Sequence, residues 1–79
     1  MTIDFLGIIV RVKGDYYAKN IEIFKSMQNI SIYLIEKDRI ILSLDCDDIK
    51  LLINRMKEIE NLEGVIDIYP VFDLVNFFL

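Results

Sequence analysis

Side chains that commonly carry out enzyme chemistry are scarce in this sequence. Cys46 is the single cysteine and histidine is absent, which excludes an intrachain disulfide, a Cys/His zinc site and a histidine acid–base pair. The neighbouring Asp45, Asp47 and Asp48 would oppose a thiolate at Cys46, so we interpret this residue as part of a loop or cap. The three glycines stand far apart, so a glycine-rich phosphate loop is missing too. Most enzyme chemistry therefore lacks its residues here.

Composition indicates one small folded domain that spans residues 1–79. Of the 79 residues, 54% are apolar and 28% are charged, which is too hydrophobic for a disordered chain. The formal charge is −4 and the pI is about 4.6, so the basic footprint of a nucleic-acid-binding protein is missing. Residues 1–4 lack the positive region of a signal peptide, and no apolar run approaches the roughly 20 residues of a membrane span. We expect a soluble, intracellular protein.

Segments with strand and helix patterns follow one another along the chain. The patterns predict strands over residues 3–13, 30–35, 39–44 and 65–72 and helices over 15–28 and from about 48 to the region before Gly64. Asp15 is the predicted N-cap of the first helix, and Asp47 or Asp48 that of the second. Residues 36–38 are predicted to form a tight turn between two antiparallel strands. Pro70 cannot donate to a strand ladder, so the last strand should lie at a sheet edge.

The order β-α-β-β-α-β predicts an α+β, ferredoxin-like sandwich. Its two halves resemble each other, because residues 8–12 correspond to residues 40–44, 32 positions later. Two right-handed βαβ units joined by a hairpin give a four-stranded antiparallel sheet with both helices on one face. The expected spatial order of the strands is 4-1-3-2.

Alternation along each strand sorts its side chains onto two faces of the sheet. The set predicted to pack under the helices is Leu6, Ile8, Val10, Val12, Ile30, Ile32, Leu34, Ile40, Leu42, Leu44, Ile66 and Ile68. The apolar members predicted for the opposite face are Phe5, Ile9, Tyr33, Ile35, Ile41, Val65, Tyr69 and Val71. Its polar or small members are Gly7, Arg11, Ser31, Arg39, Ser43 and Asp67. A sheet face open to water is normally mostly polar, and this one is not.

An exposed apolar face with aromatic residues and a polar rim is typical of a partner-binding site. Tyr33 and Tyr69 suit such a face because the ring is buried while the hydroxyl stays hydrated. Two other occupants remain open at this point. A homodimer could stack these faces, or the apolar C-terminal residues 74–79 could cover them.

The chain resembles the NapD-type maturation chaperones of periplasmic nitrate reductase over nearly its whole length. The resemblance is carried by the first strand, residues 7–12, and by the passage from the second helix into the last strand, residues 59–68, with Asn61-Leu62-Glu63-Gly64-Val65 at its centre. It implies a cytoplasmic chaperone without catalytic activity or cofactor. It also implies that the open sheet face binds, as a helix, the twin-arginine signal peptide of the nitrate reductase catalytic subunit. Export is then held back until the molybdenum cofactor and the iron–sulfur cluster are in place.

Residue alternation and this resemblance together predict a peptide-binding set on the open face. The set is Phe5, Ile9, Arg11, Tyr33, Ile35, Ile41, Ser43, Asp67, Tyr69 and Val71. Five of these, Phe5, Ile9, Tyr33, Ile41 and Tyr69, are predicted to anchor the apolar side of the peptide. The carboxylate predicted to meet its arginines is that of Asp67 or of Asp4, Glu36 or Asp73.

The competing interpretation is an ACT-like domain that binds a small effector, such as an amino acid, at a dimer interface. That function needs a glycine-containing turn after the first strand, and Gly14 supplies only part of it because Asp15 and Tyr16 follow. The sequence also favours neither nucleic acid nor a membrane as a partner.

Overall fold

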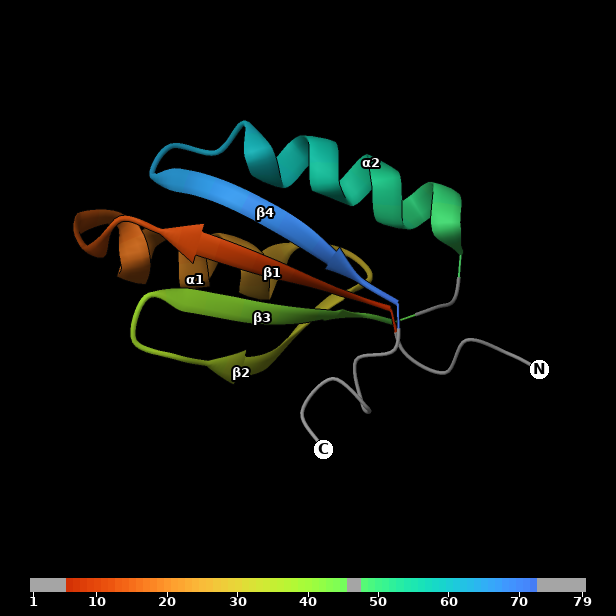
Figure 1. Ribbon diagram of the computed structural model, residues 1–79, viewed down its shortest axis with the longest axis horizontal. Helices are drawn as coiled ribbons and strands as arrows, with labels where there is room; N and C mark the ends of the chain where they lie inside the picture. Colours follow the sequence, from red (N-terminus) through yellow and green to blue (C-terminus); the bar gives the residue numbers. More distant parts are fainter. Residues whose placement is uncertain (1–5, 46–47, 73–79) are drawn as a thin grey trace.

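The computed structural model describes residues 6–45 and 48–72 of the chain. The elements are β1 (Gly7–Val12), a 3-10 turn (Gly14–Tyr16), α1 (Tyr17–Ser26), β2 (Ile30–Ile35), β3 (Arg39–Leu44), α2 (Ile49–Glu60) and β4 (Val65–Val71). The strands form one antiparallel sheet in the order β2-β3-β1-β4 (Figure 1). This arrangement confirms the predicted ferredoxin-like fold, the strand order and the edge position of the strand that carries Pro70. Residues 3–5 of the predicted first strand lie outside the described residues.

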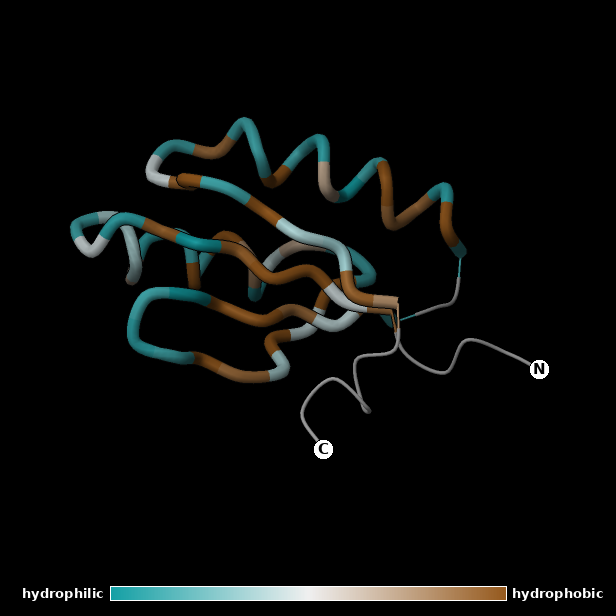
Figure 2. Tube along the Cα trace, viewed as in Figure 1, coloured by the Kyte–Doolittle hydropathy of each residue, from teal (hydrophilic) through white to brown (hydrophobic). Residues whose placement is uncertain are grey.

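The main core lies between the sheet and the two helices. It joins Phe24 of α1 and Leu52 and Ile59 of α2 to buried aliphatic residues of the strands, among them Ile8, Val10, Ile40 and Leu42. Figure 2 shows hydrophobic residues running along β1 and β3, the two central strands, whereas both helices alternate between hydrophobic and hydrophilic residues. This difference is expected, because a central strand is enclosed on several sides while a helix buries only one stripe.

The two helices begin in different ways. Asp48 caps α2, because its carboxylate accepts hydrogen bonds from the backbone N–H groups of Lys50 and Leu51, and this confirms the predicted cap. The prediction that Asp15 caps α1 is wrong. Asp15 lies inside the 3-10 turn, and the residue that precedes α1, Tyr16, makes no side-chain capping hydrogen bond. Backbone carbonyls act at this end instead: that of Lys13 accepts from the N–H of Tyr16, and that of Gly14 accepts from the N–H of Tyr17.

The loop from α2 to β4 is fastened to the start of α1. The backbone N–H of Lys13 donates to the carbonyl of Gly64 over 2.9 Å. Asn20 is fully buried, and its Nδ2 donates to the carbonyl of Glu63 over 3.2 Å. Gly64 itself has a φ of +91° and passes directly beside Tyr16. These contacts therefore tie the loop after α2 to residues 13–20, which lead into α1 and form its first turn.

Two irregularities in the strand pairing change the predicted faces. Between β2 and β3, Ile32 pairs with Leu42 but Leu34 pairs with Ile41, so β2 holds one extra residue at Tyr33. Partners that stand directly opposite share a face of the sheet. Leu34 therefore lies on the helix-free face and Ile35, the partner of Ile40, on the helix-covered side. The predicted faces of Leu34 and Ile35 are both wrong.

A second irregularity has the same effect on β4. Arg11 pairs with Asp67 and Val12 pairs with Val65, which leaves Ile66 as the extra residue. Val65 packs against the main core, and Ile66 is 50% exposed. The predicted face of Val65 is therefore wrong, and Ile66, which was predicted to pack under the helices, is half exposed. One inserted residue puts the residues on its two sides out of phase with each other, because side chains repeat every two residues along a strand.

Candidate functional site

The helix-free face of the sheet consists of three rows of cross-strand partners. The small row is Ser31, Ser43, Gly7 and Val71; the apolar row is Leu34, Ile41, Ile9 and Tyr69, with Tyr33 beside Leu34; the charged row is Arg39, Arg11 and Asp67. Each row crosses the strands from the β2 or β3 side to β4. The rows place an apolar band directly beside a charged one.

The centre of this face is buried. Ile9, Ile41 and Val71 form a second hydrophobic cluster in which Ile41 has no exposed surface. The sequence predicted these residues as part of an exposed patch, and for these three that expectation is wrong. The accessible apolar surface is on the outer strands, where Tyr33 is 45%, Leu34 39% and Tyr69 49% exposed. A ligand arriving at this face first meets these outer side chains.

The charged row contains two ion pairs. Arg11 donates from Nη1 to Oδ2 of Asp67 over 2.9 Å, and Arg39 donates from Nε to Oε1 of Glu36, in the turn between β2 and β3. The negative charge of Asp67 is the main cause that raises the pKa of the Arg11 guanidinium. The hydrogen bond to Asp67 adds to it, and so does Tyr69. Arg11 is therefore paired with a carboxylate on β4, and Arg39 with one in the β2–β3 turn.

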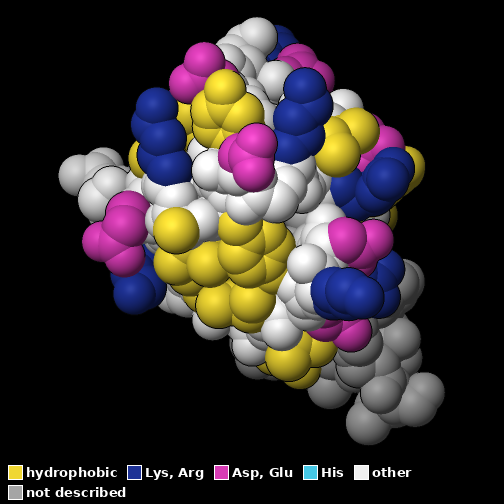
Figure 3. Space-filling model, turned by 90° about the vertical axis from the view of Figure 1, so that its left-hand side faces the viewer, with side chains coloured by type: hydrophobic (Ala, Val, Ile, Leu, Met, Phe, Trp, Pro, Cys, Tyr) yellow, Lys and Arg dark blue, Asp and Glu magenta, His cyan; other side chains and the backbone are white. Residues whose placement is uncertain are grey.

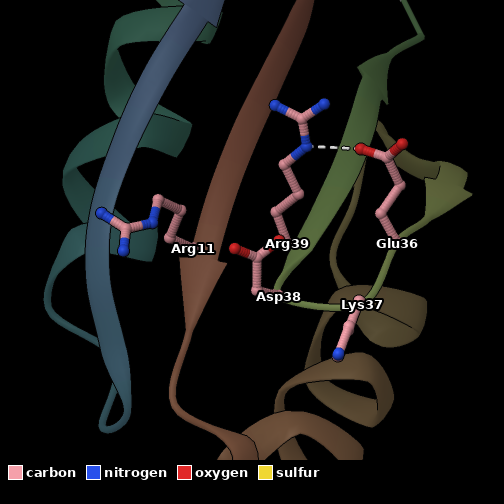
Figure 4. A pocket seen from close by; sticks show the side chains of 5 residues that line it. All are labelled: Arg11, Glu36, Lys37, Asp38 and Arg39. Carbon is pink, nitrogen blue, oxygen red and sulfur yellow. Dashed lines mark hydrogen bonds and ion pairs between the residues drawn. The ribbon is translucent and has the colours of Figure 1, made fainter.

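The charged row opens into a pocket of about 510 Å³ at the β2–β3 turn. It is lined by Arg11, Glu36, Lys37, Asp38 and Arg39. Figure 4 shows the Arg39 side chain turned toward Glu36, whereas Arg11 turns away from both and extends over β4. With ionic side chains around it, this pocket suits a charged or strongly polar group rather than an apolar ligand.

Tyr17 of α1 holds the turn that carries Glu36 and Arg39. Its hydroxyl donates to the backbone carbonyl of Glu36 and lies 3.2 Å from the carbonyl of Arg39. Burial raises the pKa of the Tyr17 hydroxyl, and the charges of Asp38 and Glu36 raise it further. The sequence predicted only that Tyr17 lies in the first helix. No local signal identifies its partners, since they lie 19 and 22 residues further along the chain.

The structure brings most of the predicted binding residues together on one face. Those on the helix-free face are Ile9, Arg11, Tyr33, Ile41, Ser43, Asp67, Tyr69 and Val71. Ile35 is not among them, because the extra residue in β2 turns it to the other side. Leu34 takes that place, and sequence alternation missed it. The predicted anchor Phe5, the alternative carboxylates Asp4 and Asp73, the loop residue Cys46 and the C-terminal residues 74–79 lie outside the described residues.

Hydrophobic side chains gather at one end of the molecule, with charged side chains of both signs around them (Figure 3). Viewed from the left-hand end of Figure 1, which carries the β2–β3 turn, hydrophobic side chains gather near the middle, with Lys, Arg, Asp and Glu around them (Figure 3). Within residues 6–45 and 48–72, no cluster of three or more Cys, Asp or Glu has a metal-site arrangement. None of the helices in this described part is long and apolar enough to cross a membrane.

Comparison with known proteins gives one finding. A family model described as "NapD protein" matches residues 5–75. No significant match appears among curated proteins or among solved structures.

Proposed function

The chain belongs to the NapD family of nitrate reductase maturation chaperones, and from this premise we propose that its helix-free sheet face binds the twin-arginine signal peptide of the nitrate reductase catalytic subunit. The bound chaperone delays export until the molybdenum cofactor and iron–sulfur cluster are inserted. It acts in the cytoplasm, before export, by binding alone and without a catalytic step or a cofactor of its own.

One observation carries the proposal: the apolar and charged rows lie side by side on the same face. A signal peptide of this type places arginines next to an apolar stretch. Leu34 and Tyr69 present apolar surface at the two sides of the face, and Glu36 and Asp67 present carboxylates at its end. The net charge of −4 favours approach of a basic peptide.

The buried centre of the face supports a particular way of binding. Ile9 and Ile41 have little or no accessible surface, so they offer little surface for direct contact with a ligand. An amphipathic helix laid across this centre would contact the exposed Tyr33 and Leu34 on one side and Tyr69 on the other. Such outer aromatic contacts contribute most when the ligand removes them from water.

The proposal is tested by titrating a synthetic twin-arginine signal peptide into the full chain, followed by calorimetry and by backbone NMR. We expect chemical shift changes at Tyr33, Leu34 and Tyr69 and in the charged row. Replacing both arginines of the peptide by glutamine should weaken binding about tenfold or more, because two charge-assisted contacts are lost. Equal affinity for the two peptides, or shift changes confined to α1 and α2, would contradict the proposal.

Two further measurements on the same samples test the other occupants of this face. Sedimentation velocity of the free protein and of the peptide complex tests whether a homodimer stacks the faces, since peptide binding should then dissociate it. A thermal-shift screen with amino acids tests the ACT-like interpretation, for which a small effector would raise the melting temperature.

A further inference from the structure

Arg11 and Arg39 are direct cross-strand partners on β1 and β3. Two like charges in this position repel each other. Here each guanidinium is paired with its own carboxylate, Arg11 with Asp67 and Arg39 with Glu36. The two described carboxylates that the charged row offers to an incoming arginine are therefore already occupied by arginines of this chain.

Asp67 is an incompletely satisfied acceptor. Its Oδ2 binds Arg11, whereas its Oδ1 is shielded from solvent and has no hydrogen-bond partner among the described residues. An acceptor left in this state is unfavourable. A guanidinium that docks side-on can donate two parallel hydrogen bonds to both oxygens of a carboxylate. Arg11, which reaches Asp67 from the adjacent strand, donates a hydrogen bond to Oδ2 and not to Oδ1.

We propose that Arg11 and Arg39 are internal substitutes for the arginines of the ligand, which displaces them from Asp67 and Glu36 when it binds. This inference rests on the proposed function and adds a specificity element to the same site. The binding free energy that a ligand side chain contributes is only the difference between its own ion pair and the internal ion pair that it replaces. Arginine can gain from this exchange by bidentate geometry, whereas lysine cannot make the same pair of bonds.

The geometry of the row suits two arginines in one peptide. Asp67 lies on β4 and Arg39 on β3, which are separated by β1, so the strands are about 10 Å apart. Glu36 lies at the far side of Arg39, in the turn. The carboxylates of Asp67 and Glu36 therefore lie at opposite ends of the charged row. Two neighbouring arginines of the peptide, whose long side chains diverge, can reach one carboxylate each. Arg11 and Arg39 both line the open pocket, so their released side chains stay beside open space.

The experiment compares three variants of the full chain for affinity to the twin-arginine peptide at low salt. Arg11→Gln removes the internal competitor and should raise the affinity about two- to fivefold, the range of an exposed ion pair. Asp67→Asn removes the acceptor and should lower it about tenfold. Lys37→Gln is the matched control, because it changes the net charge by the same amount as Arg11→Gln and lines the same pocket without releasing Asp67.

Direct observation of the exchange comes from the side-chain Nε–Hε NMR signals of Arg11 and Arg39. Both signals should shift when the peptide binds, and a lysine-pair peptide should move them less. An equal gain in affinity for Arg11→Gln and Lys37→Gln would overturn the exchange and leave the proposed function intact, since it would show a general effect of charge. Weaker binding by Arg11→Gln would also overturn it. Absence of binding by the wild-type chain would overturn the proposed function and the exchange together.

Discussion

Gly64 approaches Tyr16 so closely that a Cβ atom built on the glycine would lie 2.2 Å from the Cβ atom of Tyr16. The neighbouring carbonyl of Gly64 accepts a hydrogen bond from Lys13, and that of Glu63 accepts one from the buried Asn20. This junction connects the loop before β4 to the start of α1. It accounts for the glycine within the Asn61–Val65 passage, because both its space and its φ of +91° exclude other residues.

Gly64→Ala should therefore lower the free energy of unfolding by about 3 kcal/mol or more, since it adds a backbone penalty to a steric clash. Urea denaturation followed by circular dichroism measures the change. Gly14→Ala is the matched control: nothing lies within 4 Å of its Cβ position, so its effect should stay within about 1 kcal/mol. Equal effects of the two substitutions would contradict the importance of the junction.

Asp48→Ala should lower the free energy of unfolding by about 1 kcal/mol, because the N-cap bonds to Lys50 and Leu51 are lost. Asp15→Ala should change it by less than about 0.5 kcal/mol, since Asp15 caps neither the 3-10 turn nor α1. The same denaturation assay compares the two variants. A larger loss of stability in Asp15→Ala than in Asp48→Ala would support the predicted role of Asp15 as the N-cap of α1.

Tyr17→Phe should cost about 1 kcal/mol at neutral pH, because the backbone carbonyls of the β2–β3 turn lose their donor. It should also change how stability depends on pH. The folded protein raises the pKa of Tyr17 above its ordinary value of 10.0, so the unfolded chain loses this proton first as the pH rises. The stabilising contribution is complete below about pH 10 and is lost as the pH rises through the raised pKa. Denaturation curves of wild type and Tyr17→Phe between about pH 8 and pH 11 should therefore converge, and parallel curves would contradict this account.

Leu34→Ala should weaken binding of the twin-arginine peptide about fivefold, because Leu34 lies on the helix-free face beside Ile41. Ile35→Ala should leave the affinity unchanged, because Ile35 pairs with Ile40 and lies on the other side. The two residues are adjacent and similarly exposed, so each is the control for the other. Calorimetric titration of both variants measures the difference, and the reverse order would support the alternating pattern without the extra residue at Tyr33.

Ile41→Ala and Tyr69→Ala should separate the stability of the helix-free face from its binding. Ile41 is fully buried, so its truncation leaves a cavity and should cost about 2–5 kcal/mol of unfolding free energy. Tyr69 is 49% exposed, so its truncation should cost about 1 kcal/mol or less while it weakens the peptide complex. Thermal denaturation and titration of both variants test this division. A large loss of stability in Tyr69→Ala alone would contradict it.

The sequence by itself determined the order of the elements, the ferredoxin-like topology and the faces of the two central strands. Ile8 and Val10 lie under the helices and Ile9 and Arg11 on the opposite face, as alternation predicted. Local patterns suffice there because β1 and β3 pair with each other without an inserted residue. The same holds for Asp48, whose capping bonds reach only two and three residues along the chain.

Only the tertiary structure decided the faces of the outer-strand residues next to the two extra residues, and which side chains of the site meet. Leu34 and Ile35 changed sides because the extra residue at Tyr33 is defined by pairing with β3, which local alternation does not contain. Arg11 meets Asp67 across 56 residues, and Ile41 clusters with Ile9 and Val71, which come from two other strands. In each case the deciding contact joins residues on different strands, and the periodicity within one strand does not specify such a contact.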